Sequence, residues 1–195
     1  MAVLRKVPWF IWAGFATIGL ARLWGFLTSG VPVEVAGSGI VSQLDDDIGP
    51  DDARLAFNAA RTRSLAKAEE SVHVAINARP AVVVFGLDAE AVLSDPERAS
   101  ATYLRLTERA EAARAVPLVV GPVSDASMTG EERAAVEEVA SRWRRELCRV
   151  RGLRLCLDVA PYRDDPAGLR QAITSGIADA MLRHAEWRAS TQGGA

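Results

Sequence analysis

Lysine is nearly absent from this chain of 195 residues. Lys6 and Lys67 are the two lysines among 23 basic residues, so the other 21 are arginines, a composition typical of a bacterium with a GC-rich genome. Histidine and cysteine are equally scarce: there are two of each, at no close spacing, so we expect no metal site. Basic residues do not exceed acidic ones, and the formal net charge of −2 gives no reason to expect a nucleic-acid partner.

The first thirty residues differ in composition from the rest. Val7–Thr28 carries one charge, Arg22, and a helix of this length, rising about 1.5 Å per residue, reaches across a hydrocarbon core. Trp9 and Trp12 near one end and Trp24 near the other follow the pattern of aromatic belts at membrane interfaces. The stretch therefore predicts one transmembrane helix.

The charges beside this stretch predict its orientation. Arg5 and Lys6 precede it and few basic residues follow it, which favours a cytoplasmic N-terminus. We expect residues 1–28 to anchor the chain in a bacterial inner membrane, 29–32 to be a linker, and the rest to be periplasmic. A cleaved signal peptide, with Thr28 and Gly30 before the cut, is the alternative.

The remainder alternates between strand-like and helix-like segments. Each helix-like segment has apolar residues at helical spacing or a recognisable start, and the third and fourth strands are continuous apolar runs, as in strands buried on both faces. This order predicts an α/β fold, a five-stranded parallel sheet with helices on both faces, over a domain of residues 33–188 with a flexible tail, 189–195. The expected strands are 31–37, 53–60, 81–86, 116–121 and 153–160, and the expected helices are 62–79, 95–115, one opened by Thr129 and one after Asp165.

"GSG" at 37–39 follows the first strand, and three motifs that place glycines at such a turn do not fit it. Ser42 stands where a dinucleotide fingerprint needs its third glycine. No Gly-Lys-Ser/Thr follows for a phosphate loop, and Ala36 and Ile40 replace the glycines of a nucleophile elbow. We therefore expect no cofactor.

The order of four segments resembles the four sequence blocks of the SGNH, or GDSL-like, hydrolases. These are "VEVAGSGIV", "LAFNAARTR", "AVVVFGLDAE" and "YRDDPAGLRQAI". The resemblance implies a flavodoxin-like three-layer α/β/α sandwich and hydrolysis of esters, with Ser38 as the nucleophile. The other family positions fall on Asn58, Arg63, Gly86, Asp88, Tyr162 and Asp165.

The chain departs from this family at most of those positions. Asp165 stands at the place of the catalytic histidine, and Tyr162 at the place of the residue that orients it. Arg63 and Asp88 replace oxyanion donors, whose loss typically lowers rates by about 10²–10³ per donor. A serine without a base is a weak nucleophile. One alternative is that Asp88 and Asp165 converge near Ser38 as acid and base or as cation ligands; another is an Arg63–Asp88 salt bridge that closes the pocket.

Two further features lie near the end of the chain. Cys148 and Cys156 form either a disulfide, in an oxidising compartment, or two buried thiols. Residues 142–154 contain six arginines, which form either a solvated helix face or a contact for lipid phosphates or an acidic partner.

Together these features predict a non-catalytic, membrane-anchored structural or accessory subunit of a larger bacterial membrane complex. Its partners would be integral membrane subunits and lipid headgroups. The alternatives are a cell-envelope esterase or acyltransferase with an altered site around Ser38, and a non-catalytic module that binds a glycan or lipid.

Overall fold

A computed structural model describes residues 30–44, 48–59, 61–124, 127–149 and 152–192. The chain divides into two units, Met1–Gly30 and Val31–Ala195. The predicted anchor, with Trp9, Trp12, Arg22 and Trp24, lies outside the described residues. Within the described residues, no helix is both long enough and apolar enough to span a bilayer.

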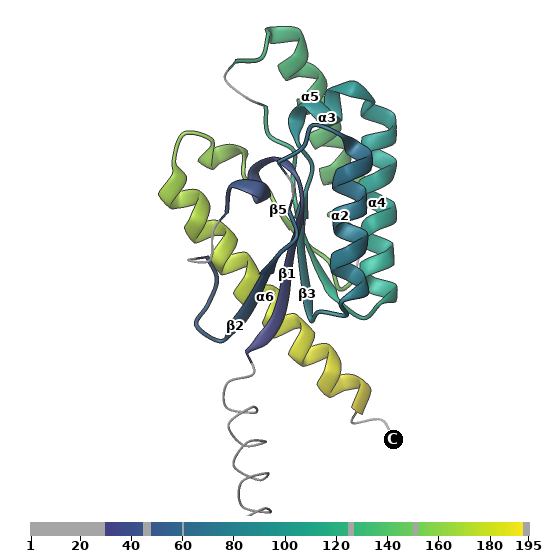
Figure 1. Cartoon of the computed structure of the whole chain (residues 1–195), viewed down its shortest axis with the longest axis vertical. Coiled ribbons are helices and arrows are strands. Elements are labelled where there is room, and N and C mark those ends of the chain that lie inside the picture. The colour runs from purple at the N-terminus through teal and green to yellow at the C-terminus, as the bar shows by residue number, and fades with distance from the viewer. Residues whose placement is uncertain (1–29, 45–47, 60, 125–126, 150–151, 193–195) are drawn as a thin grey trace, which may run out of the picture. The chain divides into compact units, whose positions relative to one another are not determined.

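The second unit is an α/β fold built on one parallel sheet of five strands (Figure 1). The strands are β1 (Val31–Gly37), β2 (Ala53–Phe57), β3 (Val82–Gly86), β4 (Val116–Val120) and β5 (Leu155–Leu157). Their order across the sheet is β2-β1-β3-β4-β5, and the register pairs Val33 with Val82 and Val82 with Val116. The predicted parallel five-stranded sheet is confirmed.

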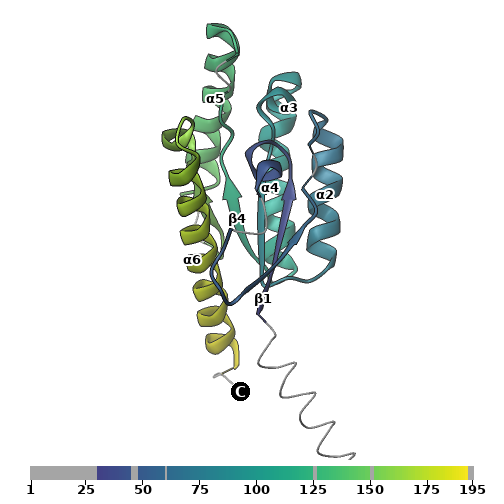
Figure 2. The same cartoon turned by 60° about the vertical axis from the view of Figure 1, so that its left-hand side comes forward.

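Helices cover both faces of this sheet, as Figure 2 shows from the side. One face packs against α2 (Leu65–Asn77), α4 (Pro96–Ala112) and α5 (Gly130–Glu146), and the other against α6 (Pro166–Gln192). Alternate residues of a strand point to opposite faces, so Val83 and Phe85 join the first core while Val82 and Val84 join the second. All four are completely buried.

Local sequence signals set where the helices begin. Asp95 caps α4 by accepting a hydrogen bond from the Arg98 N–H, with Pro96 as the first helical residue. Thr129 and Glu132 form a capping box at the start of α5. These starts agree with the prediction.

Several boundaries differ from the predicted ones. β1 matches the predicted strand 31–37, so the sheet begins inside the expected linker of 29–32, and the edge strands β2 and β5 are shorter than predicted. A 3₁₀ helix η1 (Gly39–Gln43), a second one η2 (Ala160–Tyr162) and the six-residue α3 (Ala89–Ser94) were not predicted. Residues 189–192 were expected in the flexible tail, but they continue α6.

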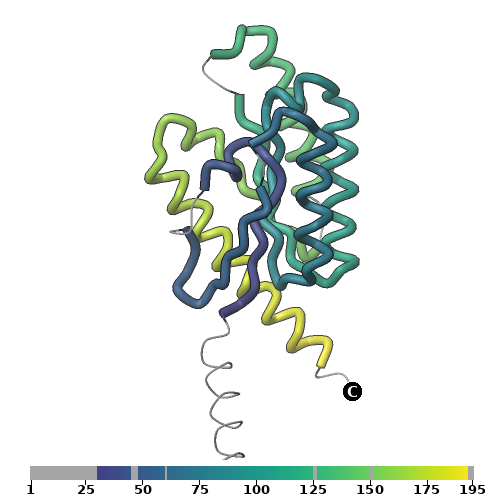
Figure 3. The backbone as a smooth tube through the Cα atoms, viewed as in Figure 1, coloured from purple at the N-terminus to yellow at the C-terminus, as the bar shows by residue number. Residues whose placement is uncertain are grey.

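The strand order reverses between β1 and β3. The chain moves from β1 outward to β2, then returns to the other side of β1 and continues through β3, β4 and β5 (Figure 3). In open α/β sheets ligands bind outside the carboxyl ends of the strands at this reversal. The loops after Gly37 and Gly86 are therefore where a site is expected.

Candidate functional site

Ser38 follows the end of β1 at this reversal and has no exposed surface. Its backbone N–H donates to the carbonyl oxygen of Gly86 over 3.0 Å, and its Oγ accepts a hydrogen bond of 2.9 Å from the backbone N–H of Asp88. Both partners belong to the end of β3 and the loop after it. The side chain therefore joins the ends of two neighbouring strands, and its hydroxyl is enclosed by backbone.

Gly37 makes this close approach possible. Its φ is +89°, and a Cβ built there would lie 2.2 Å from the carbonyl oxygen of Gly86. Its N–H donates to Ser71 Oγ over 2.9 Å, and the Ser71 hydroxyl donates to the carbonyl oxygen of Asn58 over 2.6 Å. A chain of hydrogen bonds thus links the ends of β1 and β2 to α2.

Asn58 and its neighbours serve this same structural link. The Asn58 side-chain amide donates to the carboxylate of Glu34, and its backbone N–H donates to the Val35 carbonyl oxygen over 2.7 Å. Burial raises the pKa of Glu34, against the opposing effects of Asn58 and Arg54. Asn58 does not line the crevice described below.

Asp88 acts as the cap of α3. Its carboxylate accepts a hydrogen bond of 2.9 Å from the N–H of Glu90. The Tyr103 hydroxyl accepts from the N–H of Leu87 over 3.1 Å and donates to the carbonyl oxygen of Val120 over 3.2 Å. Burial raises the pKa of Tyr103 well above its ordinary range, so the hydroxyl stays protonated. The loop after β3 is thus fixed at Leu87 by the Tyr103 hydroxyl and at Asp88 by its cap of α3.

The predicted Arg63–Asp88 salt bridge is wrong. The Arg63 guanidinium pairs with Glu90 over 2.7 Å, and both side chains are largely exposed, at 79% and 46%. Exposed pairs of this kind contribute little to stability, typically about 0–1 kcal/mol.

Tyr162 and Asp165 also lie apart from Ser38. The Asp165 carboxylate accepts a hydrogen bond of 2.9 Å from the N–H of Gly168, so it caps the first turn of α6. Tyr162 lines a different cavity, of about 470 Å³, between β5 and α6. The alternative in which Asp88 and Asp165 converge near Ser38 finds no support, because each carboxylate caps a helix and Asp165 lines a separate cavity.

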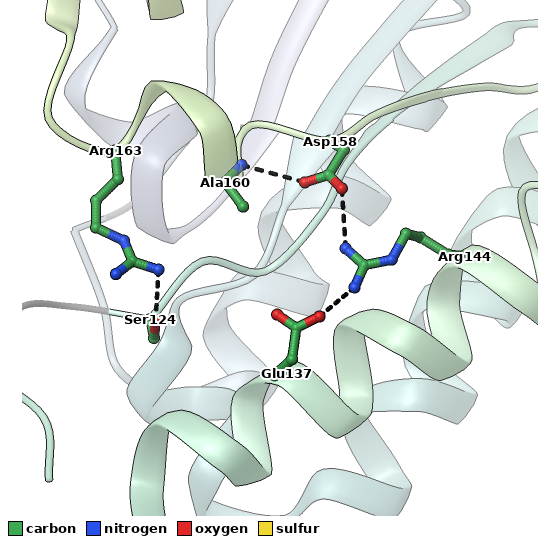
Figure 4. Close-up of polar contacts among 6 residues, drawn as sticks. All are labelled: Ser124, Glu137, Arg144, Asp158, Ala160 and Arg163. Atoms are coloured by element: carbon green, nitrogen blue, oxygen red, sulfur yellow. Dashed lines mark hydrogen bonds and ion pairs between the residues drawn. The ribbon is translucent and has the colours of Figure 1, made fainter. Parts of the chain in front are cut away.

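A crevice of about 320 Å³ does open at the strand reversal. It is lined by η1, by the start of α3, and by the loops after β4 and η2. Arg163 crosses it and donates to Ser124 Oγ over 2.9 Å (Figure 4). Arg163 and Ser124 were not predicted, since neither belongs to a motif.

Neither the predicted nucleophile nor a histidine lines the crevice. Ser38 does not line it, and neither does His73 or His184, the two histidines of the chain. His73 lies in α2, 3.5 Å from Glu69, and His184 packs against Trp187 in α6. Among the described residues, no three acidic, histidine or cysteine side chains gather to hold a metal ion.

Two arginines of 142–154, Arg144 and Arg154, serve contacts within the domain. Arg144 bridges Glu137 of α5 and Asp158 after β5, the latter over 2.8 Å, and Asp158 also accepts from the Ala160 N–H (Figure 4). Burial alone would lower the pKa of Arg144, but the two carboxylates raise it. Arg154, 8% exposed, pairs with Glu111 of α4. The expected lipid or partner contact therefore loses two of its six arginines.

Cys148 and Cys156 form a disulfide, with their Cα atoms 5.7 Å apart. The bond joins the residues after α5 to the middle of β5, which agrees with the predicted positions of both cysteines. The alternative of two buried thiols is not what the structure contains. A short edge strand is thus tied covalently to the helix that packs beside it.

Comparison with known proteins gives no family for this chain. The resemblance to the SGNH hydrolases in four sequence segments therefore stays a prediction, and the geometry above is the basis for proposing a function. The chain matches no protein-family model, no curated protein and no solved structure.

Proposed function

We propose that this protein is a non-catalytic, membrane-anchored structural subunit whose periplasmic domain keeps an SGNH-like, flavodoxin-like fold without the chemistry. One observation carries the proposal: Ser38 is fully buried and its Oγ accepts the N–H of Asp88. A hydroxyl in that position stabilises the sheet and does not meet substrate.

The other family positions support the same conclusion. Asp88 caps α3, Asp165 caps α6 and Asn58 binds Glu34, so each polar group is used by a local structural contact. The strand order is that of flavodoxin-like sheets, in which the reversal lies between β1 and β3. We take this enzyme-like fold as support for a scaffold role and not for catalysis.

The disulfide and the apolar stretch support the proposed location. Disulfides persist in oxidising compartments such as the bacterial periplasm and are rare in the cytosol. Val7–Thr28 is long enough to cross the membrane and is preceded by Arg5 and Lys6. A single anchor with a periplasmic domain fits both observations.

Purification of the full-length chain from native membranes in mild detergent tests this proposal. We expect integral membrane proteins to co-purify at constant stoichiometry, measured by mass spectrometry, for both the natural chain and Ser38→Ala. A chain that elutes as a lone monomer would overturn the structural-subunit role. Release of the chain by alkaline carbonate would overturn the anchor.

The crevice favours a second candidate, a binding module for a small polar ligand such as a glycan. Its walls carry two acidic residues, Asp88 and Asp164, together with Arg163, and its volume of about 320 Å³ is in the range of small-molecule sites. Ligand-induced thermal stabilisation that is lost in Arg163→Gln and kept in Ser38→Ala would establish this role. Ester hydrolysis lost in Ser38→Ala would establish instead the esterase alternative.

A further inference from the structure

Two arginines occupy left-handed backbone positions at the amino ends of the strands, which is the edge of the sheet opposite the crevice. Arg79 has φ +56° and follows α2, and Arg114 has φ +66° and follows α4. They are the only non-glycine residues with positive φ in the described part of the chain. Both hold the position after a helix cap at which glycine is the usual residue.

The choice of arginine at these positions is not explained by the fold. A left-handed conformation brings a Cβ close to the backbone, and glycine avoids that penalty. A favourable interaction with the helix dipole is open to a cation anywhere in the last turn, without this conformation. Strain kept at two equivalent positions is grounds for a functional hypothesis.

Both side chains are exposed and carry free charge. Neither forms an ion pair with any residue that the structure describes, in contrast to Arg154 at the same edge, which is buried against Glu111. The two loops lead into neighbouring strands, where the Val116 N–H donates to the Ala81 carbonyl oxygen over 2.8 Å. The two arginines thus stand in adjacent loops.

These loops lie beside the place where the chain enters the domain. The Ala81 N–H donates to the carbonyl oxygen of Pro32 over 2.9 Å, one residue into β1. The apolar stretch ends at Thr28, four residues before Pro32 in the sequence. Arg79 and Arg114 therefore belong to the edge of the domain nearest, along the chain, to the proposed anchor.

The end of α6 adds an exposed helical surface at this edge. Its last buried residue is Met181, and the helix continues past the sheet to Gln192 (Figures 1 and 2). This overhang carries Leu182, 61% exposed, with Trp187 and Arg188. Tryptophan and arginine together are the side chains that membrane interfaces favour.

We propose that this edge, formed by Arg79, Arg114 and the overhang of α6, binds the phosphates of anionic phospholipids. The proposal rests on the proposed function, because it needs residues 7–28 to anchor the chain. Guanidinium groups bind phosphate through paired N–H donors, and charge complementarity selects anionic headgroups over zwitterionic ones.

Native mass spectrometry of the full-length chain in neutral detergent tests this, with equal phosphatidylglycerol and phosphatidylcholine added. We expect preferential retention of phosphatidylglycerol, and a preference reduced by about fivefold per arginine in Arg79→Gly/Arg114→Gly. Glycine suits both left-handed positions, so this double variant should fold with little change in melting temperature. Arg79→Lys/Arg114→Lys should keep most of the preference.

A matched control removes two charges from the opposite edge. Arg61→Gln/Arg98→Gln should leave the lipid preference unchanged. Equal preference in the natural chain and the double glycine variant would overturn the proposal. So would loss of a co-purifying protein in that variant with lipid selectivity intact, since the arginines would then contact a protein. Carbonate extraction of the natural chain, measured separately, reports failure of the anchor itself.

Discussion

The two edges of the sheet use their polar residues in opposite ways. At the carboxyl edge, where α/β proteins keep their reactive groups, Ser38, Asp88 and Asp165 all accept hydrogen bonds from nearby backbone. At the amino edge, Arg79 and Arg114 are exposed and unpaired within the described residues, although their backbone conformation is unfavourable. In other α/β proteins the carboxyl edge carries the catalytic groups. The difference indicates that this domain uses the polar groups of that edge for stability and presents charge from its amino edge.

The largest expected effect tests the close approach of β1 to β3. Gly37→Ala should destabilise the domain by roughly 3 kcal/mol or more, because a Cβ would lie 2.2 Å from a backbone oxygen in a left-handed conformation. Denaturant unfolding measures the change. Gly130→Ala is the control, since nothing lies within 4 Å of a Cβ there and alanine favours the helix. Equal stability of the two variants would show that the strand ends are loosely joined.

The next effect concerns the covalent link between α5 and β5. Cys148→Ser/Cys156→Ser should lower stability by about 2.5 kcal/mol, the loop-closure entropy expected for a bond between residues eight apart. The melting temperature of the natural chain should fall on reduction, and that of the double variant should not change. A natural chain insensitive to reductant would mean that the thiols are unpaired in solution.

Ser38→Ala tests the carboxyl edge directly. The N–H of Asp88 would lose its acceptor in a buried place, which costs about 1–3 kcal/mol. Ser190→Ala, on the exposed overhang of α6, is the matched control and should be nearly neutral. Unchanged stability in Ser38→Ala, together with loss of a hydrolytic activity, would reverse the comparison and restore Ser38 as a nucleophile.

The fold was predictable because its signals are local and repeated. Continuous apolar runs such as 81–86 and 116–121 mark strands buried on both faces, and Asp95, Pro96 and Thr129 mark helix starts. α3 was missed because six residues are too few to show a helical period. The end of α6 was missed because small polar residues are typical of loose tails.

The site was less predictable because it depends on distances between segments. Sequence order predicts that Asp88 and Asp165 follow strands of one sheet. It does not predict which backbone N–H will donate to each carboxylate. Arg63 illustrates the same limit: Asp88 and Glu90 are two residues apart, and the sequence does not tell which of them pairs with the guanidinium. Left-handed Arg79 and Arg114 carry no sequence signal, since arginine is common near helix ends.

The smallest expected effect lies at the capping box of α5, beside the crevice loop. Hydrogen bonds from the Thr129 N–H and hydroxyl lower the pKa of Glu132 below its usual value. A lowered folded-state pKa gives stability that is present above the unfolded pKa of about 4.5 and lost as pH falls through the folded value. Glu132→Gln keeps an acceptor but no charge, so it should be less stable than the natural chain at neutral pH and equal to it in acid. The free energy of unfolding of Glu132→Gln and of the natural chain, measured across this pH range, checks that the two become equal in acid. Glu131→Gln lies outside the capping box and should show no such convergence with the natural chain. Parallel curves of stability against pH for the two variants would assign the effect to the general negative charge at the start of the helix. Thr129 would then cap α5 through its hydroxyl alone.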